Sequence, residues 1–346
     1  MITTKNQISG LCKLGTYIQR FLEKKPDNFD ENDAVFQDVL LKSKTENQWF
    51  TLENQKFALK NWADLLNEEN ITNWLKNYEV AKNPKRVGLV LAGNIPMVGF
   101  HDVISVVLSG NFPVIKLSSK DRLLLPFLLK KWNDFSEGNV SYEFVEKLES
   151  FDAVIATGSN NTARYLEFYF KDSLNIIRKN RTSVAVLKGD ETDEELRKLA
   201  EDIFRYFGLG CRNVTRLFIP EDFILDRLFE NFLSFQDIIN HHQYANNYDY
   251  NRAIYLLNQE KFWDNNFVML KEDEGLFSPL SVLNFSRYEN IDEVKNFLQE
   301  NEQNIQCVVA KRDLDIPDSV DFGEAQNPGL DTYADHVDTM RFLEVI

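Results

Sequence analysis

The spacing of apolar positions divides the chain into a helical first part and a part in which strands and helices alternate. Up to about residue 80, apolar residues recur at helical spacing, as at Leu11, Leu14 and Ile18. From residue 86 onward, short continuous apolar runs end in glycine or in small polar residues. Such runs are typical of parallel strands that are buried on both faces. The pattern therefore predicts an α/β protein.

Four of these runs predict successive strands of one sheet. They are residues 87–93 (VGLVLAG), 111–119 (NFPVIKLSS), 151–159 (FDAVIATGS) and 182–189 (TSVAVLKG). Helical stretches lie between them, and this alternation predicts an open, doubly wound α/β sheet. In such sheets ligands bind beyond the carboxyl ends of the strands. We therefore expect the AGN, KLSS and TGS sequences to gather in one crevice.

A second α/β region follows these strands. An amphipathic helix over residues 193–207 leads to a glycine-bearing loop around Cys211. Further strands are predicted at residues 214–219, 253–257, 281–285 and 305–310. The length of 346 residues suits two domains or one large domain.

Composition narrows the classes of partner. The chain has 39 Lys and Arg against 54 Asp and Glu, which gives a formal charge of −15. Such acidity opposes nonspecific binding to nucleic acid or to an anionic membrane. No apolar segment approaches the ~20 residues that span a bilayer, and the first residues lack the apolar core of a signal peptide. We therefore expect no nucleic-acid partner, no membrane insertion and a cytoplasmic location.

Cys211 is the first candidate for chemistry. The sequence FGLGCRNVTRLFIP places it after a glycine pair, which disfavours helix and strand, and beside Arg212. A thiolate is a nucleophile, and nearby positive charge favours it. The residues alone are equally consistent with a buried structural cysteine. Cys12 and Cys307 fit core positions, and the wide spacing of the three cysteines predicts neither a disulfide framework nor a zinc site.

Asn94 and Lys116 lie at the ends of the first two predicted strands. The amide of Asn94 is able to donate a hydrogen bond to an oxyanion, although asparagine is also common in turns before a proline. Lys116 is followed by Ser118, and a lysine with hydroxyls at a strand end suits a ribose or a phosphate. A solvated lysine is the alternative for that position.

Thr157, Gly158 and Ser159 end the third predicted strand and lead into a helix. A helix N-terminus supplies free N–H groups and glycine allows close approach, so this is a candidate phosphate turn. A serine that only caps the helix is the alternative. The chain has no GxGxxG sequence, and its histidines lack metal-like spacing, so no metal site is predicted.

The ordered set of motifs resembles one superfamily. A strand with AGNIP, a strand with KLSS, a strand with TGS and then GLGC is similar to the aldehyde dehydrogenases, and GLFSPLSVLNF resembles a later segment of them. Within that superfamily, VLAGNIPMVGFHD, ATGSNN, IIRKNRTSVAVL and GLGCRNVTRLFIP resemble the acyl-CoA reductases of the LuxC type. The resemblance covers roughly residues 85–346. It implies N-terminal helices and a nucleotide-binding domain over residues 1–189, rejoined by 319–346, and a catalytic domain over 190–318.

The resemblance also implies roles for the candidate residues. Cys211 would attack a thioester carbonyl and form an acyl-enzyme with release of coenzyme A, while Asn94 and the Cys211 N–H would hold the oxyanion. The implied cofactor contacts are Lys116 and Ser118 at the adenosine ribose, Thr157, Gly158 and Ser159 near the pyrophosphate and nicotinamide, and Phe277 near the nicotinamide ribose.

Departures from the superfamily pattern refine the expected activity. Many members place a Glu about thirty-four residues before the cysteine, as the base that hydrolyses the acyl-enzyme. Here residues 173–183 contain no carboxylate. Losing a general base typically costs ~10²–10⁴ in rate, so this absence favours a reductase over a hydrolytic dehydrogenase. Gly275 stands where many relatives have a Glu that contacts the nicotinamide ribose. The sequence therefore does not predict which residue makes that contact here.

The expected function is an acyl-CoA reductase that uses NAD(P)H and releases an aldehyde. NAD-preferring relatives often carry Glu after Lys-x-Ser, and this chain has Ser119 there, so NADPH is expected with NADH as the alternative. Three alternative functions stay open. They are aldehyde oxidation, reduction of an acyl phosphate, for which Arg178, Arg181 and Arg212 could supply an anion pocket, and a non-catalytic role. The chain is short for the superfamily, so the oligomerisation hairpin is expected to be reduced and a homo-oligomer remains an open expectation.

Overall fold

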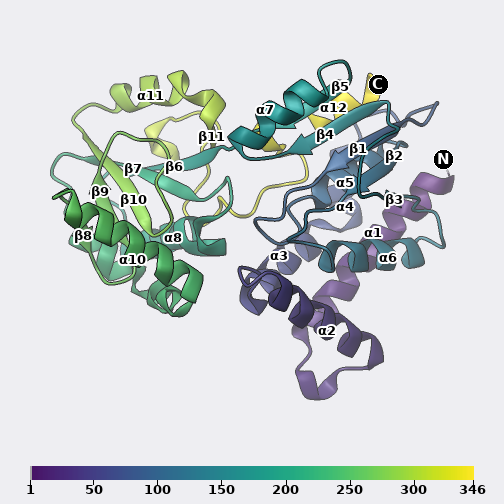
Figure 1. Ribbon diagram of the computed structural model, residues 1–346, viewed down its shortest axis with the longest axis horizontal. Helices are drawn as coiled ribbons and strands as arrows, with labels where there is room; N and C mark the ends of the chain where they lie inside the picture. Colours follow the sequence, from purple (N-terminus) through teal and green to yellow (C-terminus); the bar gives the residue numbers. More distant parts are fainter. Residues whose placement is uncertain (1) are drawn as a thin grey trace. The chain divides into compact units, whose positions relative to one another are not determined.

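The chain forms two compact units in the computed structural model, which describes residues 2–346. The first unit comprises Met1–Lys179 together with Gly329–Ile346, and the second comprises Asn180–Pro328. The chain thus leaves the first unit, builds the second and returns to the first (Figure 1). No helix within residues 2–346 has both the length and the apolar character that crossing a lipid bilayer requires.

Four helices precede the first sheet, as the helical spacing predicts. They are α1 (Ile2–Glu23), α2 (Glu31–Glu46), α3 (Leu52–Leu65) and α4 (Glu68–Leu75). Side-chain caps mark where they begin: Asp30 forms a capping box with Asp33, while Thr51 and Asn67 each accept a hydrogen bond from a backbone N–H in the first turn. Leu11, Leu14 and Ile18 of α1 are completely buried in the core of this unit.

The first sheet has five parallel strands in the order β3-β2-β1-β4-β5. Its elements are β1 (Arg86–Val90), α5 (Phe100–Leu108), β2 (Phe112–Lys116), α6 (Leu124–Phe135), β3 (Glu143–Phe144), β4 (Ala153–Thr157), α7 (Asn160–Tyr169) and β5 (Leu174–Arg178). The strand order reverses between β1 and β4, and ligands bind at such a switch point in open α/β sheets. The chain returns after the second unit to add α12 (Thr339–Glu344).

Alternate residues of the first sheet are buried on opposite faces. Leu89, Ile115 and Ile155 pack in the core that α1, α5 and α6 complete. Val114 and Val154 pack on the other face, with residues of α7 and the segment after it. This double burial explains why the strands read as continuous apolar runs.

The second sheet has six strands in the order β11-β6-β7-β10-β9-β8, of which only the β8–β9 pair is antiparallel. Its elements are β6 (Thr182–Val186), α8 (Asp193–Phe204), β7 (Val214–Pro220), α9 (Asp226–Phe232), α10 (His242–Leu257), β8 (Trp263–Asp264), β9 (Met269–Glu272), β10 (Val282–Tyr288), α11 (Ile291–Glu300) and β11 (Ile305–Ala310). One face packs with α8 and α9, and the other packs with α11.

Two strand predictions are corrected by the structure. The run at residues 182–189 was expected in the first sheet, but β6 pairs with β7 and β11 in the second sheet. Residues 253–257 were expected as a strand, but they form the last part of α10. That helix buries Tyr244, Tyr248 and Tyr255 on one side, and this tertiary burial outweighs the β-favouring composition of the AIYLL run. The first unit ends at Lys179 rather than at residue 189, because β6 belongs to the second sheet.

Candidate active site

Cys211 lies in a turn between the 3-10 helix η2 (Arg205–Gly208) and β7, and it is half-buried. The chain reaches it through an unusual backbone run: Tyr206, Phe207 and Gly208 all have left-handed conformations, with φ of 55°, 60° and 78°. Bulky residues rarely adopt this conformation, and such strain persists only where the surroundings fix it. The turn that carries Cys211 is therefore held in one shape by its neighbours.

Asn213 is the residue that holds this turn. Its side chain is completely buried, and Oδ1 accepts the N–H of Gly210 at 2.8 Å. Its Nδ2 donates to the carbonyls of Asp202 at 3.1 Å, Ile203 at 3.2 Å and Arg205 at 2.8 Å. One amide thus joins the end of α8, η2 and the start of β7. Asn213 is not among the residues predicted from the sequence, although its place as a polar residue directly before an apolar strand is a signal for it.

The neighbouring strand β6 also supports the turn. The Ser183 hydroxyl donates to the carbonyl of Cys211 at 3.1 Å, and the Ser183 N–H donates to the carbonyl of Asn213 at 3.1 Å. Cys307 of β11 pairs with Ser183 in the parallel ladder and is buried. Burial raises the pKa of the Cys307 thiol to about 11, although Arg212 opposes this shift. Cys307 is therefore a protonated core thiol at neutral pH, as its strand position predicts.

Asp202 and Arg212 attach a later segment of the chain to the same region. The buried Asp202 carboxylate accepts the N–H groups of Gly323 at 2.7 Å and Ala325 at 3.0 Å. Arg212 donates to the carbonyl of Ala325 at 3.3 Å. Burial raises the pKa of Asp202 from its ordinary 3.8 to about 7, although the two backbone N–H groups lower it. Asp202 therefore has a pKa near neutrality.

This raised pKa predicts a pH dependence of stability. Between about pH 4 and pH 7 the unfolded chain releases the Asp202 proton while the folded chain keeps it, so the free energy of unfolding falls as pH rises. We expect Asp202→Asn to lack this loss, so that its stability relative to wild type increases by about 2–4 kcal/mol between pH 4.5 and pH 8. Urea unfolding across this range measures it.

Glu194→Gln, which removes an exposed carboxylate of the same helix, is the control and should show no such trend. A constant difference between Asp202→Asn and wild type at every pH would contradict the assignment.

The strand-end residues of the first unit come together at one edge of its sheet. In the register, Val90 lies beside Lys116 on one side and beside Ala156 on the other. A Cβ built on Gly93 would lie 2.5 Å from the Ser118 Oγ, so the loops after β1 and β2 touch and glycine is required there. Lys116 and Ser118 are both half-buried. The predicted gathering of the AGN and KLSS sequences is therefore present.

The TGS sequence lies at the same edge. Thr157 is the last residue of β4, and the Gly158 N–H donates to the carbonyl of Arg178 at 3.2 Å. Ser159 is exposed and caps α7, since its Oγ accepts the N–H of Thr162 at 3.3 Å. The capping role that the sequence left open for Ser159 is thus present.

Asn94 follows β1 in a half-buried bend. The bend is fixed by Met97, which has a left-handed φ of 60°, and by Asp121, whose Oδ2 accepts the Met97 N–H at 3.4 Å. Burial raises the pKa of Asp121 to about 6. Asn47, the residue that directly follows α2, donates to the carbonyl of Gly93 at 3.4 Å. Sequence reasoning missed Asn47 and Asp121, because both act through backbone contacts that are distant in the chain.

Phe277 belongs to the second unit, in the loop between β9 and β10, and its side chain is 48 % exposed. The Thr215 hydroxyl donates to the carbonyl of Leu276 at 2.8 Å. Thr215 is in β7, shortly after Cys211, so the second unit brings the cysteine turn and the Phe277 loop to the same strand. Asn94 and the strand-end residues are in the first unit.

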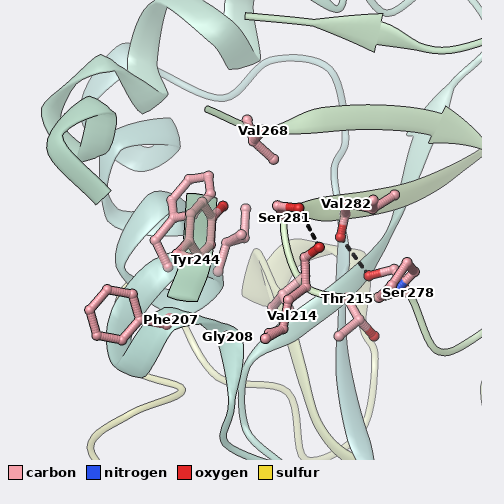
Figure 2. Close-up of a pocket in the computed structure, with 13 residues that line it drawn as sticks. Phe207, Gly208, Val214, Thr215, Tyr244, Val268, Ser278, Ser281 and Val282 are labelled. Atoms are coloured by element: carbon pink, nitrogen blue, oxygen red, sulfur yellow. Dashed lines mark hydrogen bonds between the residues drawn. The ribbon is translucent and has the colours of Figure 1, made fainter. Parts of the chain in front are cut away.

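A small cavity lies behind the cysteine turn. Figure 2 shows Phe207 and Tyr244 on one side of it and Thr215 with the Ser278–Val282 loop on the other, where the Ser278 hydroxyl donates to the Val282 carbonyl at 2.6 Å. Its volume is about 30 Å³, which is room for roughly one water molecule. The cavity is too small for an acyl chain or a nicotinamide, so its walls support the turn rather than bind substrate.

Within residues 2–346 no cluster of three or more His, Cys, Asp or Glu side chains is arranged to hold a metal ion.

Solved structures show the fold. Aldehyde dehydrogenase 21 from Physcomitrella patens, with succinate bound, matches 89 % of this chain and 73 % of its own with a TM-score of 0.64 at 12 % identity. A benzaldehyde dehydrogenase from Corynebacterium glutamicum matches 89 % of this chain and 76 % of its own, with a TM-score of 0.62 at 10 % identity. An aldehyde dehydrogenase C variant from Pseudomonas syringae, with NAD⁺ and octanal, matches 90 % and 73 %, with a TM-score of 0.62 at 12 % identity. These likenesses confirm the predicted fold class.

The family is shown by sequence. Comparison with curated proteins gives no match. Residues 41–314, most of the chain, match the family described as acyl-CoA reductase (LuxC), which confirms the resemblance read from the motifs. The chain therefore belongs to the acyl-CoA reductase (LuxC) family, oxidoreductases of the aldehyde dehydrogenase fold that act on aldehydes or acyl-CoA with a nicotinamide cofactor.

Proposed function

We propose that this protein reduces an acyl-CoA thioester to the aldehyde through an acyl-enzyme on Cys211. The observation that carries the proposal is the Cys211 turn, a half-buried thiol on a strained and side-chain-anchored backbone, in a chain of the acyl-CoA reductase family. A strained turn that buried side chains hold in place fits a nucleophilic Cys211 better than a purely structural one, because backbone strain is retained mainly at functional positions.

The first half of the reaction is acyl transfer. The Cys211 thiolate attacks the carbonyl carbon of the thioester, a C–S bond to the enzyme forms, and the bond to coenzyme A breaks so that its thiolate leaves with the electron pair. The oxyanion that forms in between needs fixed donors, and Asn94 and the Cys211 N–H are proposed for that role. The bond from Ser183 to the Cys211 carbonyl fixes the plane of the adjoining peptide.

The second half is reduction. A nicotinamide, when bound, would supply the hydride that reduces the thioester carbon. Cys211 would then leave as the thiolate, taking the electron pair of its C–S bond, and the aldehyde would be released. The switch-point edge of the first sheet would hold such a cofactor at Lys116 and Ser118, which are half-buried there at the end of β2, next to the end of β1, which in turn lies beside β4. We propose NADPH, since Ser119 and Lys120 are exposed after Ser118 and the loop offers no exposed carboxylate to repel a 2′-phosphate.

Hydrolysis of the acyl-enzyme is disfavoured in this proposal. The segment from β5 to the start of β6 contains no carboxylate that would activate water. Arg178 at the end of β5 is buried and paired with Asp102 at 2.6 Å, so this buried aspartate is engaged within the first unit. Without a base the acyl group remains on Cys211 until hydride arrives.

Intact-protein mass spectrometry tests the proposal. Wild-type protein incubated with a panel of acyl-CoAs in the absence of nicotinamide is expected to gain the mass of one acyl group. Addition of NADPH should discharge the adduct and release the aldehyde, and NADH in a parallel sample ranks the two cofactors. Absence of an adduct with every thioester, in protein that binds nicotinamide, would overturn the acyl-CoA assignment and favour aldehyde oxidation or acyl-phosphate reduction.

A further inference from the structure

The geometry points to Arg216 as a positioning residue that fixes the loop carrying Phe277 for the bound nicotinamide. Arg216 lies in β7, five positions after Cys211, and the loop lies between β9 and β10. The inference rests on the proposed function, since it concerns how the same site receives its cofactor. It adds a residue that neither the family match nor the motifs assign.

The environment of Arg216 is unusual for an arginine. The residue is only 3 % exposed, although arginine is mostly found at the surface. Its guanidinium lies 4.5 Å from the centroid of Phe218 and 4.4 Å from that of Phe297, and these two rings also contact each other at 5.3 Å. Cation–π contacts with both rings favour one orientation of the group. Burial lowers the pKa of Arg216, and the nearby Glu274 and Asp273 partly offset this.

The donors of Arg216 are directed at the loop and at the strand beside it. One terminal nitrogen, Nη1, donates to the carbonyl of Glu274, and the other, Nη2, donates to the Ser286 hydroxyl at 2.9 Å. The Nε has no hydrogen-bond partner within the described chain. A buried guanidinium that donates to a backbone carbonyl orients that backbone segment, because a hydrogen bond from a charged donor is stronger than one from a neutral donor.

Two more side chains donate hydrogen bonds to the next two backbone carbonyls of the loop. The Asn284 amide donates to the carbonyl of Gly275 at 2.8 Å, and the Thr215 hydroxyl donates to that of Leu276 at 2.8 Å. Three successive carbonyls, of residues 274–276, are thus each held by a side chain from β7 or β10. Arg216 and Asn284 are direct partners in the ladder between these strands.

Residues 274–276 of this loop are therefore held by side chains, although loops are usually mobile. Phe277 follows the three held carbonyls and is 48 % exposed. Gly275 has no side chain of its own, and a Cβ there would lie 2.8 Å from the Asp273 Oδ1, so that carboxylate would have to shift to admit one. Position 275 therefore offers only its backbone to a ribose, and the recognition in this inference rests on the backbone of residues 274–276 and on Phe277. Fixing a binding group before the ligand arrives reduces the entropy lost on binding.

Arg216→Met tests the inference, because methionine keeps an apolar chain against the Phe218 and Phe297 rings but donates no hydrogen bond. We expect the KM for NADPH to rise about tenfold or more, in line with the loss of a charge-assisted hydrogen bond. Acylation of the variant by acyl-CoA without nicotinamide should proceed at the wild-type rate. Arg216→Lys, which keeps the charge and one donor, should recover part of the KM.

The matched control is Arg287→Met. Arg287 also lies in the second sheet and donates to the backbone carbonyls of Glu221 and Phe223, but not to the Phe277 loop. It should leave the KM for NADPH unchanged. If Arg216→Met does not fold, Thr215→Val removes the bond to Leu276 with little change of shape and should raise the KM in the same direction.

The outcomes separate the inference from the proposed function. Wild-type protein that is acylated and reduced, beside an Arg216→Met variant with an unchanged KM for NADPH, overturns the inference alone. The same holds if acylation falls as much as reduction does, because the arginine then only supports the fold. Wild-type protein that no thioester acylates overturns the proposed function itself.

Discussion

Cys211→Ala is expected to abolish acylation by acyl-CoA and to lower the rate of aldehyde formation by at least about 10⁴-fold, because removal of the nucleophile eliminates the covalent route. The substitution removes only one sulfur from a half-buried position, so the anchors of the turn through its backbone stay in place. The free energy of unfolding should therefore change little. Intact mass after incubation with acyl-CoA and a continuous assay of NADPH consumption measure the two losses.

Cys307→Ala is the matched control for that experiment. Cys307 is a cysteine of the same unit, but it is buried and its raised pKa of about 11 keeps it protonated. The variant should still be acylated once, although loss of the buried sulfur is expected to reduce its stability. An acyl adduct that persists in Cys211→Ala and disappears in Cys307→Ala would transfer the nucleophile to the second cysteine.

Asn213→Ala is expected to lower the free energy of unfolding by about 3–5 kcal/mol, because it removes four hydrogen bonds and leaves buried backbone groups without partners. The left-handed residues Tyr206 and Phe207 lose the anchor that keeps them strained, so the Cys211 turn should relax. The rate of acylation of Cys211 should also fall, even at temperatures where the variant is fully folded. Chemical unfolding and the acylation rate of folded protein test both parts.

Asn231→Ala serves as the comparison. Asn231 is also a buried asparagine of the second unit, but its amide donates mainly to the Arg227 carbonyl within its own helix. Its replacement should cost about 1 kcal/mol and leave acylation unchanged. Equal losses in the two variants would show that Asn213 has no special role in the turn.

Local pattern was enough to predict much of the nucleotide-binding unit. Parallel strands buried on both faces leave continuous apolar runs, and their polar ends at Gly93, Ser118 and Thr157 are adjacent in sequence to the strands that carry them. The Cys211 loop could also be predicted from the sequence, because Gly208 and Gly210 interrupt the pattern of apolar residues on its N-terminal side. These features depend on neighbours in the chain.

The remaining features depend on partners that are distant in the chain. Nothing within residues 182–189 tells which sheet the strand joins, because that is decided by its pairing with β7 and β11. Asn213 directly precedes the strand β7 and Arg216 lies within it, and both read as ordinary polar residues in the sequence. Their importance follows from which carbonyls their side chains reach. The apolar end of α10 reads as a strand until its tyrosines are seen to pack along one side of a helix.

The return of the chain to the first unit has a consequence for the order of folding during synthesis. Residues 180–328 are contiguous, so the second unit can fold as soon as it leaves the ribosome. The first unit must wait, because Arg178 donates to Thr339 at 3.0 Å, Trp74 to Tyr333 at 2.8 Å and Asn111 to the Leu343 carbonyl at 3.2 Å. The first unit therefore completes its fold after the second unit has been translated. Until α12 is added, Arg178 lacks the hydrogen bond to the Thr339 hydroxyl.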